Sequence, residues 1–239
     1  MRPNAGILNF KFQIPNIVGG AHPRWWRGFL PLLLSAGGLF GCAQDLPQRQ
    51  YYILQAQRSS GEGGAGPAAP AVLLVEPFRV DAAFAGRQLV YRVSEFGYET
   101  DYYHQFLTPP ATMLSERTRD WFANSGLFQQ VVAPGGPAPA THTLTGHVVA
   151  LYGDFAHPTA ATAVLEIRFS LLRAGGAGET TLFSKTYQAR NSVTARAADA
   201  VVAALNQDLV QILTQLETDV RQHLGSQAGS GVRGQGATG

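Results

Sequence analysis

The clearest structural signal in this sequence is residues 163–172, Ala-Val-Leu-Glu-Ile-Arg-Phe-Ser-Leu-Leu. Apolar residues at every odd position from Leu165 to Leu171 alternate with polar residues from Glu166 to Ser170. A hydrophobic period of two predicts a β-strand with one buried side and one side that faces solvent. We therefore expect this stretch to lie in a sheet that needs a cover on its apolar face.

Similar signals flank this strand on both sides. Strands are predicted over residues 141–152 and 181–190, and the glycine-rich segment 175–178 connects the last two strands, so the three should form an antiparallel meander. Apolar residues spaced three to four apart over residues 195–224 predict an amphipathic helix. This helix is the expected cover of the sheet.

The chain before residue 141 adds shorter elements. Strands are predicted over residues 72–75, 88–93, 96–103 and 127–132. A helix should begin at the two prolines after Thr108, which is placed to cap it, and end near Gly126. Together these patterns predict an α+β fold, an antiparallel or mixed β-sheet with two helices packed on one face, in a single domain behind an export signal.

The export signal precedes the only cysteine. An apolar block over residues 28–40 follows Arg24 and Arg27, and it is too short to span a bilayer, which fits a secretory signal. Its end, Leu39-Phe40-Gly41-Cys42, resembles the lipobox of bacterial lipoproteins, in which the thiol receives a diacylglycerol. We expect covalent lipid on Cys42 to hold the protein on a membrane, with no other cofactor.

Domain bounds follow from these signals. We predict a lipoprotein signal peptide over residues 1–41, a lipidated tether over 42–50, and the folded domain over 51–224. The Gly, Ala and Pro-rich stretch 59–70 should be a flexible loop inside the domain. The strand-forming run at Tyr51, before this loop, fits a strand of the domain rather than part of the tether. Residues 225–239 should form a disordered tail.

The overall charge argues against nucleic acid as a partner. The chain carries 18 basic and 16 acidic residues, but four of the basic ones and none of the acidic ones precede Cys42. Removing the signal leaves 14 basic against 16 acidic residues, a net charge of −2. No stripe of Lys and Arg with interleaved aromatics remains to follow a phosphate backbone.

Several short motifs, taken in order, resemble the ABC-type transport auxiliary lipoprotein family, which includes the PqiC-like intermembrane transport lipoproteins. They are Tyr51-Tyr52-Ile53-Leu54, Leu73-Leu74-Val75-Glu76-Pro77, Leu89-Val90-Tyr91-Arg92, and Ser125-Gly126-Leu127-Phe128 with Val131. The resemblance covers roughly residues 39–224. One part differs, because many members carry an Arg-Trp pair where this chain reads Tyr102-Tyr103-His104-Gln105-Phe106.

The resemblance implies partners and a location. The partners would be an MCE-domain protein and the ABC permease and ATPase of a lipid transporter between the two membranes. This chain has no Gly-rich loop that ends in Gly-Lys-Ser/Thr, so ATP would be hydrolysed elsewhere. Ala43, rather than Asp, after the cysteine favours the periplasmic leaflet of the outer membrane, with the periplasmic face of the inner membrane as the alternative.

Two other functions stay open from the sequence. One is an outer-membrane lipoprotein that regulates or scaffolds peptidoglycan assembly, and the other is an anchored hydrolase. The chain has no Gly-x-Ser-x-Gly or Ser-x-x-Lys motif, so we expect no enzyme and name no catalytic residue.

One set of aromatic residues is a candidate surface for a partner or for acyl chains, because tyrosine combines an apolar ring with a polar tip. It comprises Phe96, Tyr98, Tyr102, Tyr103 and Phe106. Packing across the strands of a hairpin would equally account for these residues. His142 and His147 should point to opposite faces of one strand, so we expect no metal site there.

Overall fold

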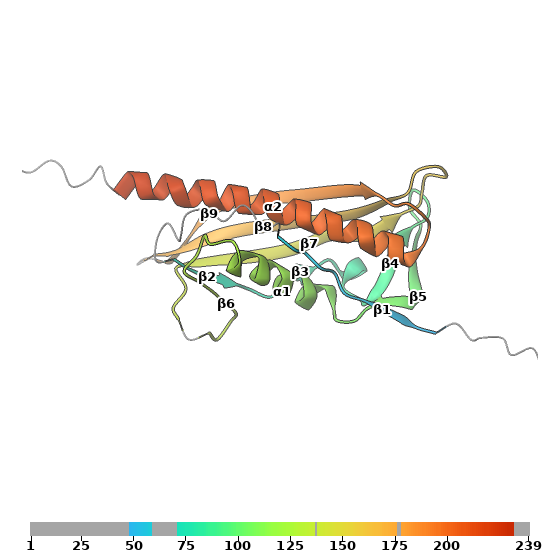
Figure 1. Ribbon diagram of the computed structural model, residues 1–239, viewed down its shortest axis with the longest axis horizontal. Helices are drawn as coiled ribbons and strands as arrows, with labels where there is room; N and C mark the ends of the chain where they lie inside the picture. The colour runs from blue at the N-terminus through green and yellow to red at the C-terminus, as the bar shows by residue number, and fades with distance from the viewer. Residues whose placement is uncertain (1–47, 59–70, 137, 176–177, 232–239) are drawn as a thin grey trace, which may run out of the picture. The chain divides into compact units, whose positions relative to one another are not determined.

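A computed structural model describes residues 48–58, 71–136, 138–175 and 178–231 (Figure 1). The central strand, β7 (His142–Asp154), pairs antiparallel with β8 (Thr162–Gly175), and β8 pairs antiparallel with β9 (Gly178–Ser192). The predicted meander is confirmed. All three strands are longer than predicted, because pairing continues along both ladders, from His142 to Asp154 between β7 and β8 and from Thr162 to Gly175 between β8 and β9.

Short strands build the rest of the sheet. Three of them run parallel to β7 and follow one another along its other edge, namely β2 (Val72–Val75), β3 (Arg79–Val80) and β4 (Gln88–Arg92). Three more extend the sheet from these, namely β6 (Gln130–Val132) beside β2, β5 (Tyr98–Phe106) beside β4 and β1 (Gln50–Tyr52) beside β5. The sheet is therefore mixed.

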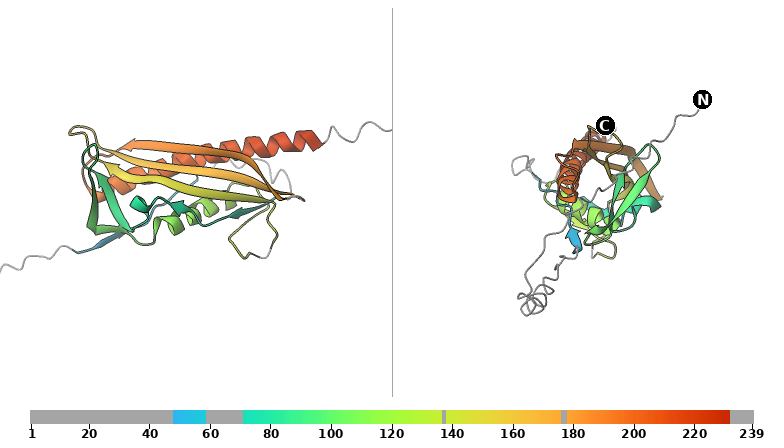
Figure 2. Two further views of the ribbon diagram at one scale, coloured as in Figure 1. Left: turned by 180° about the vertical axis from the view of Figure 1, so that it is seen from behind. Right: turned by 90° about the vertical axis from the view of Figure 1, so that its right-hand side faces the viewer.

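Both long helices, α1 (Pro110–Ala123) and α2 (Ala198–Gly231), pack on the same face of the sheet (Figure 2). The odd-numbered residues from Leu165 to Leu171 on β8 are fully buried beneath them, as the alternation predicts. The predicted α+β fold, a mixed sheet with two helices in one domain, is confirmed. A short 3-10 helix, η1 (Ala82–Phe84), separates β3 from β4.

A glycine on β7 allows close packing in the core. A Cβ atom added to Gly146 would lie 2.7 Å from ring carbons of Phe78, and no side chain fits at that distance. Phe78 is 4% exposed and meets the ring of Phe169 edge-on at 5.5 Å between centroids. The aromatic ring thus fills the space that a side chain at position 146 would take.

The ends of the helices differ from the sequence prediction. Thr108 does not cap α1, because Pro109 has an extended conformation (φ −54°, ψ 141°) and occupies the N-cap position itself. A residue that precedes proline is excluded from helical geometry, so the helix begins only at Pro110. Helix α2 runs to Gly231, and its last turns extend over residues 225–231, where a disordered tail was expected. A helix that is already formed tolerates single glycines at a cost of about 1 kcal/mol each.

Several predicted features lie outside the described residues. They are the signal peptide, the lipobox residues Leu39, Phe40 and Gly41, Cys42 itself, and the 59–70 loop. Within the described ranges, no helix combines the length and the apolar character needed to cross a membrane.

Candidate functional site

Residues 50–58, which we call the strap, pass between the two helices. The backbone N–H of Leu54 donates to Met113 Sδ on α1 at 3.2 Å, and the N–H of Gln55 donates to Asn206 Oδ1 on α2 at 2.8 Å. Leu54 is fully buried in the core. The strap, which is the first part of the folded chain after the predicted lipid site, is therefore built into the domain.

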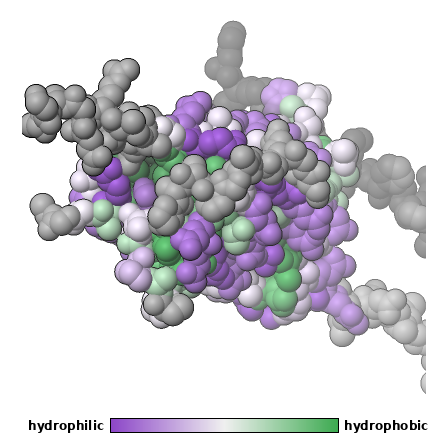
Figure 3. Space-filling view, turned by 60° about the vertical axis from the view of Figure 1, so that its left-hand side comes forward, coloured by the Kyte–Doolittle hydropathy of each residue, from purple (hydrophilic) through white to green (hydrophobic). Residues whose placement is uncertain are grey.

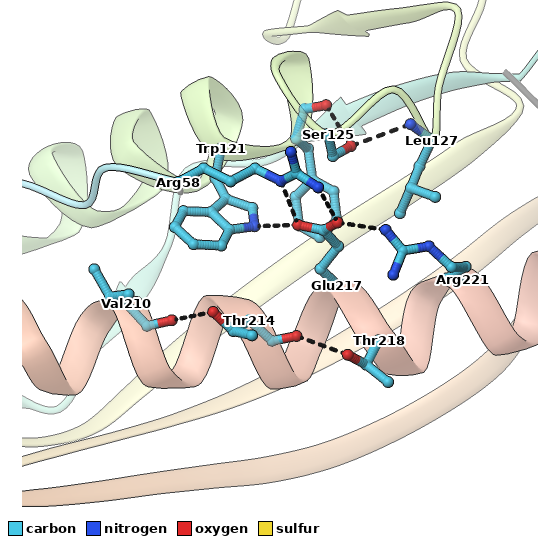
Figure 4. Close-up of polar contacts among 10 residues, drawn as sticks. Arg58, Trp121, Ser125, Leu127, Val210, Thr214, Glu217, Thr218 and Arg221 are labelled. Carbon is cyan, nitrogen blue, oxygen red and sulfur yellow. Dashed lines mark hydrogen bonds and ion pairs between the residues drawn. The ribbon is translucent and has the colours of Figure 1, made fainter. Parts of the chain in front are cut away.

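A buried glutamate holds the end of the strap (Figure 4). Both carboxylate oxygens of Glu217, on α2, accept from Arg58, with Nε at 3.0 Å from Oε2 and Nη2 at 2.9 Å from Oε1. Trp121 on α1 donates its indole N–H to Oε2 at 2.8 Å, and Arg221 donates to Oε1 at 2.6 Å. One carboxylate thus joins the strap and both helices.

Two arginines keep the carboxylate of this network ionised. Burial alone would raise the pKa of Glu217, but the hydrogen bonds and the charge of Arg58, with help from Trp121 and Arg221, outweigh burial and leave this pKa below its usual value. The side chains of Arg58 and Glu217 are 13% and 6% exposed, so the pair is largely desolvated. A carboxylate surrounded by permanent cations stays ionised and has no proton to exchange near neutral pH, so its role is to hold structure.

The sequence analysis does not identify this network, although one signal for it exists. Glu217 lies among Leu213, Leu216 and Val220 on the apolar face of α2, where an acidic residue must find a partner. Its main partner, Arg58, is 159 residues away in sequence, so no local pattern connects the two.

A bulge in β5 displays two tyrosines. Gln88 and Val90 of β4 pair with Gln105 and Thr100 of β5, so β5 carries extra residues between these two points. Asp101 folds this excess into a tight turn, because its Oδ1 accepts the backbone N–H groups of both Tyr103 (2.9 Å) and His104 (3.0 Å).

The other carboxylate oxygen of Asp101 contacts two more side chains and so stabilises the turn. Its Oδ2 lies 2.7 Å from His104 Nδ1 and accepts the hydroxyl of Tyr91 at 3.2 Å. Partial burial alone would raise the pKa of Asp101. The hydrogen bonds from His104 and Tyr103 have the larger effect, so this pKa lies below its usual value. The carboxylate is therefore charged and fully used inside the turn, and it leaves Tyr102 and Tyr103 at the surface.

We call the exposed group at this bulge the Tyr–Arg cluster, and it consists of Arg49, Tyr51, Arg87, Tyr102 and Tyr103. The guanidinium of Arg49 lies 4.2 Å from the centre of the Tyr102 ring, which meets the Tyr103 ring edge-on at 5.2 Å. Hydrogen bonding to Tyr102 and then to Tyr51 raises the pKa of Arg49. Arg87 lies 6.0 Å from the centre of the Tyr51 ring.

The cluster is accessible. Tyr51 is 48% exposed, Tyr102 59% and Tyr103 39%, and both arginines are exposed as well. The face shown in Figure 3 is mainly hydrophilic, and its hydrophobic residues form small separate patches. Exposed tyrosines paired with arginines are typical of surfaces that bind another molecule.

The structure divides the aromatic residues that the sequence proposes. Tyr102 and Tyr103 belong to the cluster, whereas Phe96, 86% exposed, lies in the turn between β4 and β5, and Tyr98 packs edge-on against Tyr152 at 5.6 Å. Phe106 does not belong to any surface, because it is only 2% exposed.

Strand pairing explains the burial of Phe106. Its strand is enclosed there between Tyr52 of β1 and the backbone at Arg87, so the side chain turns into the core. Arg49, Tyr51 and Arg87 join the cluster only through tertiary contacts, and the sequence prediction misses them.

The histidines take separate roles. His142 is buried, and its ring meets Phe128 at 6.0 Å between centroids, while Nε2 of His147 lies 2.7 Å from Asp81 Oδ1. In the part of the chain that the structure describes, no group of three or more His, Cys, Asp or Glu residues is arranged to hold a metal ion.

Comparison with solved structures identifies the class of fold. The crystal structure of protein XCC0632 from Xanthomonas campestris matches 74% of this chain and 99% of its own length, with a TM-score of 0.63 and 20% sequence identity. The crystal structure of an uncharacterized protein matches 72% of this chain and 99% of its own length, with a TM-score of 0.56 and 16% identity. At these identities the likeness concerns the fold alone. No curated protein sequence is significantly similar to this chain.

The family model gives the more specific assignment. The model of the ABC-type transport auxiliary lipoprotein component matches residues 52–217, from the strap to the buried glutamate of α2. The chain therefore belongs to the family of ABC-type transport auxiliary lipoproteins, as the sequence motifs indicate. This membership makes it a transport-associated lipoprotein of the cell envelope.

Proposed function

We propose that this lipoprotein is an auxiliary component of an ABC/MCE-type system that moves lipids between the inner and outer membranes. In this role, lipid on Cys42 would anchor it to the periplasmic leaflet of the outer membrane, and the folded domain would bind or bridge the transporter. The proposal rests chiefly on the position of the family match, which begins at residue 52, ten residues after the cysteine of a lipobox sequence.

The arrangement of the strap supports an anchored role. The chain enters the core at Leu54 and is held again at Arg58 by the buried Glu217, so the strap that follows the predicted tether is fixed within the domain. A partner bound to the domain would then be kept within the reach of the tether from the membrane. A docking component needs this confinement, whereas a freely diffusing carrier does not.

Energy for transport would come from the partners. The chain has two lysines, Lys11 and Lys185, and neither follows a glycine as a phosphate-binding loop requires. The permease and ATPase of the transporter would therefore drive the reaction, and the MCE-domain protein would be the direct contact in the periplasm.

The test is crosslinking in intact cells with the full-length protein, followed by identification of the captured partner. We expect an MCE-domain protein or its permease. A Cys42→Ala variant should leave the membrane fraction and lose this crosslink, and mass spectrometry of the normal protein should show lipid on Cys42. Capture of a peptidoglycan synthase in place of transporter subunits would refute the transport role and support the scaffold function.

A further inference from the structure

The Tyr–Arg cluster lies at the start of the folded chain. Arg49, which stacks on Tyr102, is the second described residue, and only residues 43–47 separate Gln48 from Cys42. Six residue steps reach at most about 20 Å even when fully extended. If Cys42 carries lipid, as the proposed function requires, this short connection keeps the cluster close to the bilayer surface.

The chemistry of the cluster suits that location. Tyrosine rings collect at membrane interfaces, where the ring meets the acyl boundary and the hydroxyl meets water. Arginine pairs well with phosphate through its fork of N–H groups. Asp101 directs its hydrogen bonds to Tyr103, His104 and Tyr91 within the turn, and in the described part of the chain it forms no ion pair with either arginine of the cluster.

Exposed apolar residues continue the same surface. Leu107 is 47% exposed, and its carbonyl oxygen accepts a hydrogen bond from Arg87 at 3.2 Å. Ile53, 42% exposed, is two residues along the strap from Tyr51. An exposed apolar group of this kind, rimmed by cations, is a common sign of contact with a membrane or a partner.

We propose that the Tyr–Arg cluster is a membrane seat, in which Tyr102 and Tyr103 enter the headgroup region of the bilayer while Arg49 and Arg87 bind lipid phosphates. The inference rests on the proposed lipid anchor, and it adds the orientation of the domain. The ends of β8 and β9 at Gly175 and Gly178 lie at the far end of strands that begin near the hairpin of β4 and β5 (Figure 1), and in this orientation they would face away from the membrane. A strand of 14 residues puts Gly175 roughly 45 Å from the near end.

The test uses the mature lipoprotein reconstituted in vesicles of phosphatidylethanolamine and phosphatidylglycerol that contain lipid brominated on the acyl chain near the headgroup, which quenches the emission of an indole that enters the bilayer. One variant carries Tyr102→Trp, and a matched control carries Thr180→Trp on the exposed start of β9. Trp121 is 4% exposed and contributes the same background to both. Exposure of Tyr102 makes its replacement by another aromatic residue tolerable.

We expect brominated lipid to reduce the emission of the indole at position 102 and to leave the indole at position 180 unchanged. Equal emission from both variants with and without brominated lipid would overturn the membrane seat. Quenching at position 180 alone would overturn the orientation. Loss of the seat would leave the transport role standing, and capture of a different partner in the crosslinking test would leave the seat standing as long as Cys42 carries lipid.

Discussion

Replacing Glu217 with Gln tests whether the buried carboxylate holds the strap between the helices. The carboxylate accepts four N–H groups, two from Arg58 and one each from Trp121 and Arg221, whereas an amide offers one acceptor oxygen and places its own NH2 against the remaining donors. The variant keeps the size of the side chain, so the change concerns charge and hydrogen bonding alone.

The expected loss follows from the burial of the pair. Removing one partner of a buried ion pair costs about 3–5 kcal/mol, because the other charge stays desolvated. Arg58 retains 13% exposure and Arg221 retains 44%, and both recover some hydration, so we expect the lower end of that range, about 3 kcal/mol. In a domain of this size, that loss lowers Tm by roughly 6–12 °C.

The assay is urea unfolding of Glu217→Gln beside Asp120→Asn, which removes the same charge from an exposed pair. Asp120 lies 3.4 Å from Arg117 with 55% of its side chain exposed, so its replacement should change the free energy of unfolding by less than about 0.5 kcal/mol. Hydrogen exchange should accelerate at the strap amides of Leu54 and Gln55 in the first variant only. Equal stability of the two variants would refute the reasoning.

Three further predictions concern single side chains. Burial raises the pKa of Asp208 to about 6, above its unfolded value of 3.8, so stability should fall as pH rises through this interval, and Asp208→Asn should flatten that slope in unfolding curves at pH 4 and pH 7. Asp101→Ala removes the acceptor from the β5 bulge, and we expect a loss of about 2 kcal/mol together with faster hydrogen exchange at Tyr103; unchanged exchange there would contradict the role given to Asp101. Gly146→Ala should cost about 1–3 kcal/mol, because the new methyl group overlaps the Phe78 ring, and a Tm equal to that of the parent would show that the ring can move aside.

Local patterns were sufficient for the long strands and helices of the fold, whereas β3 and the short helix η1 were not predicted. The period of two in residues 163–172 and the three-to-four spacing after residue 195 both report which side of an element is buried, and β8 and α2 bury those sides. The helix begins one residue later than predicted, because Pro110 keeps Pro109 out of helical geometry, and Pro109 takes the N-cap position in place of Thr108.

The candidate surface was recovered only in part. The sequence predicted a hairpin with tyrosines that could form a surface, and Tyr102 and Tyr103 are at the surface. Phe106 was assigned to that surface wrongly, because its exposure depends on whether β1 pairs beside it, and no local pattern reports this pairing. The same pairing brings Arg49 to Tyr102, and the sequence pattern does not predict this contact either.

The sequence by itself determined the α+β class, the meander, the covering helix and the family, because each depends on periodicity or on short motifs within one segment. Tertiary structure alone decided the path of the strap, the burial of Glu217 against Arg58, and the makeup of the Tyr–Arg cluster. These features join residues that are far apart along the chain, and the free energy of a buried charge or a shared surface depends on which distant groups the fold brings into contact.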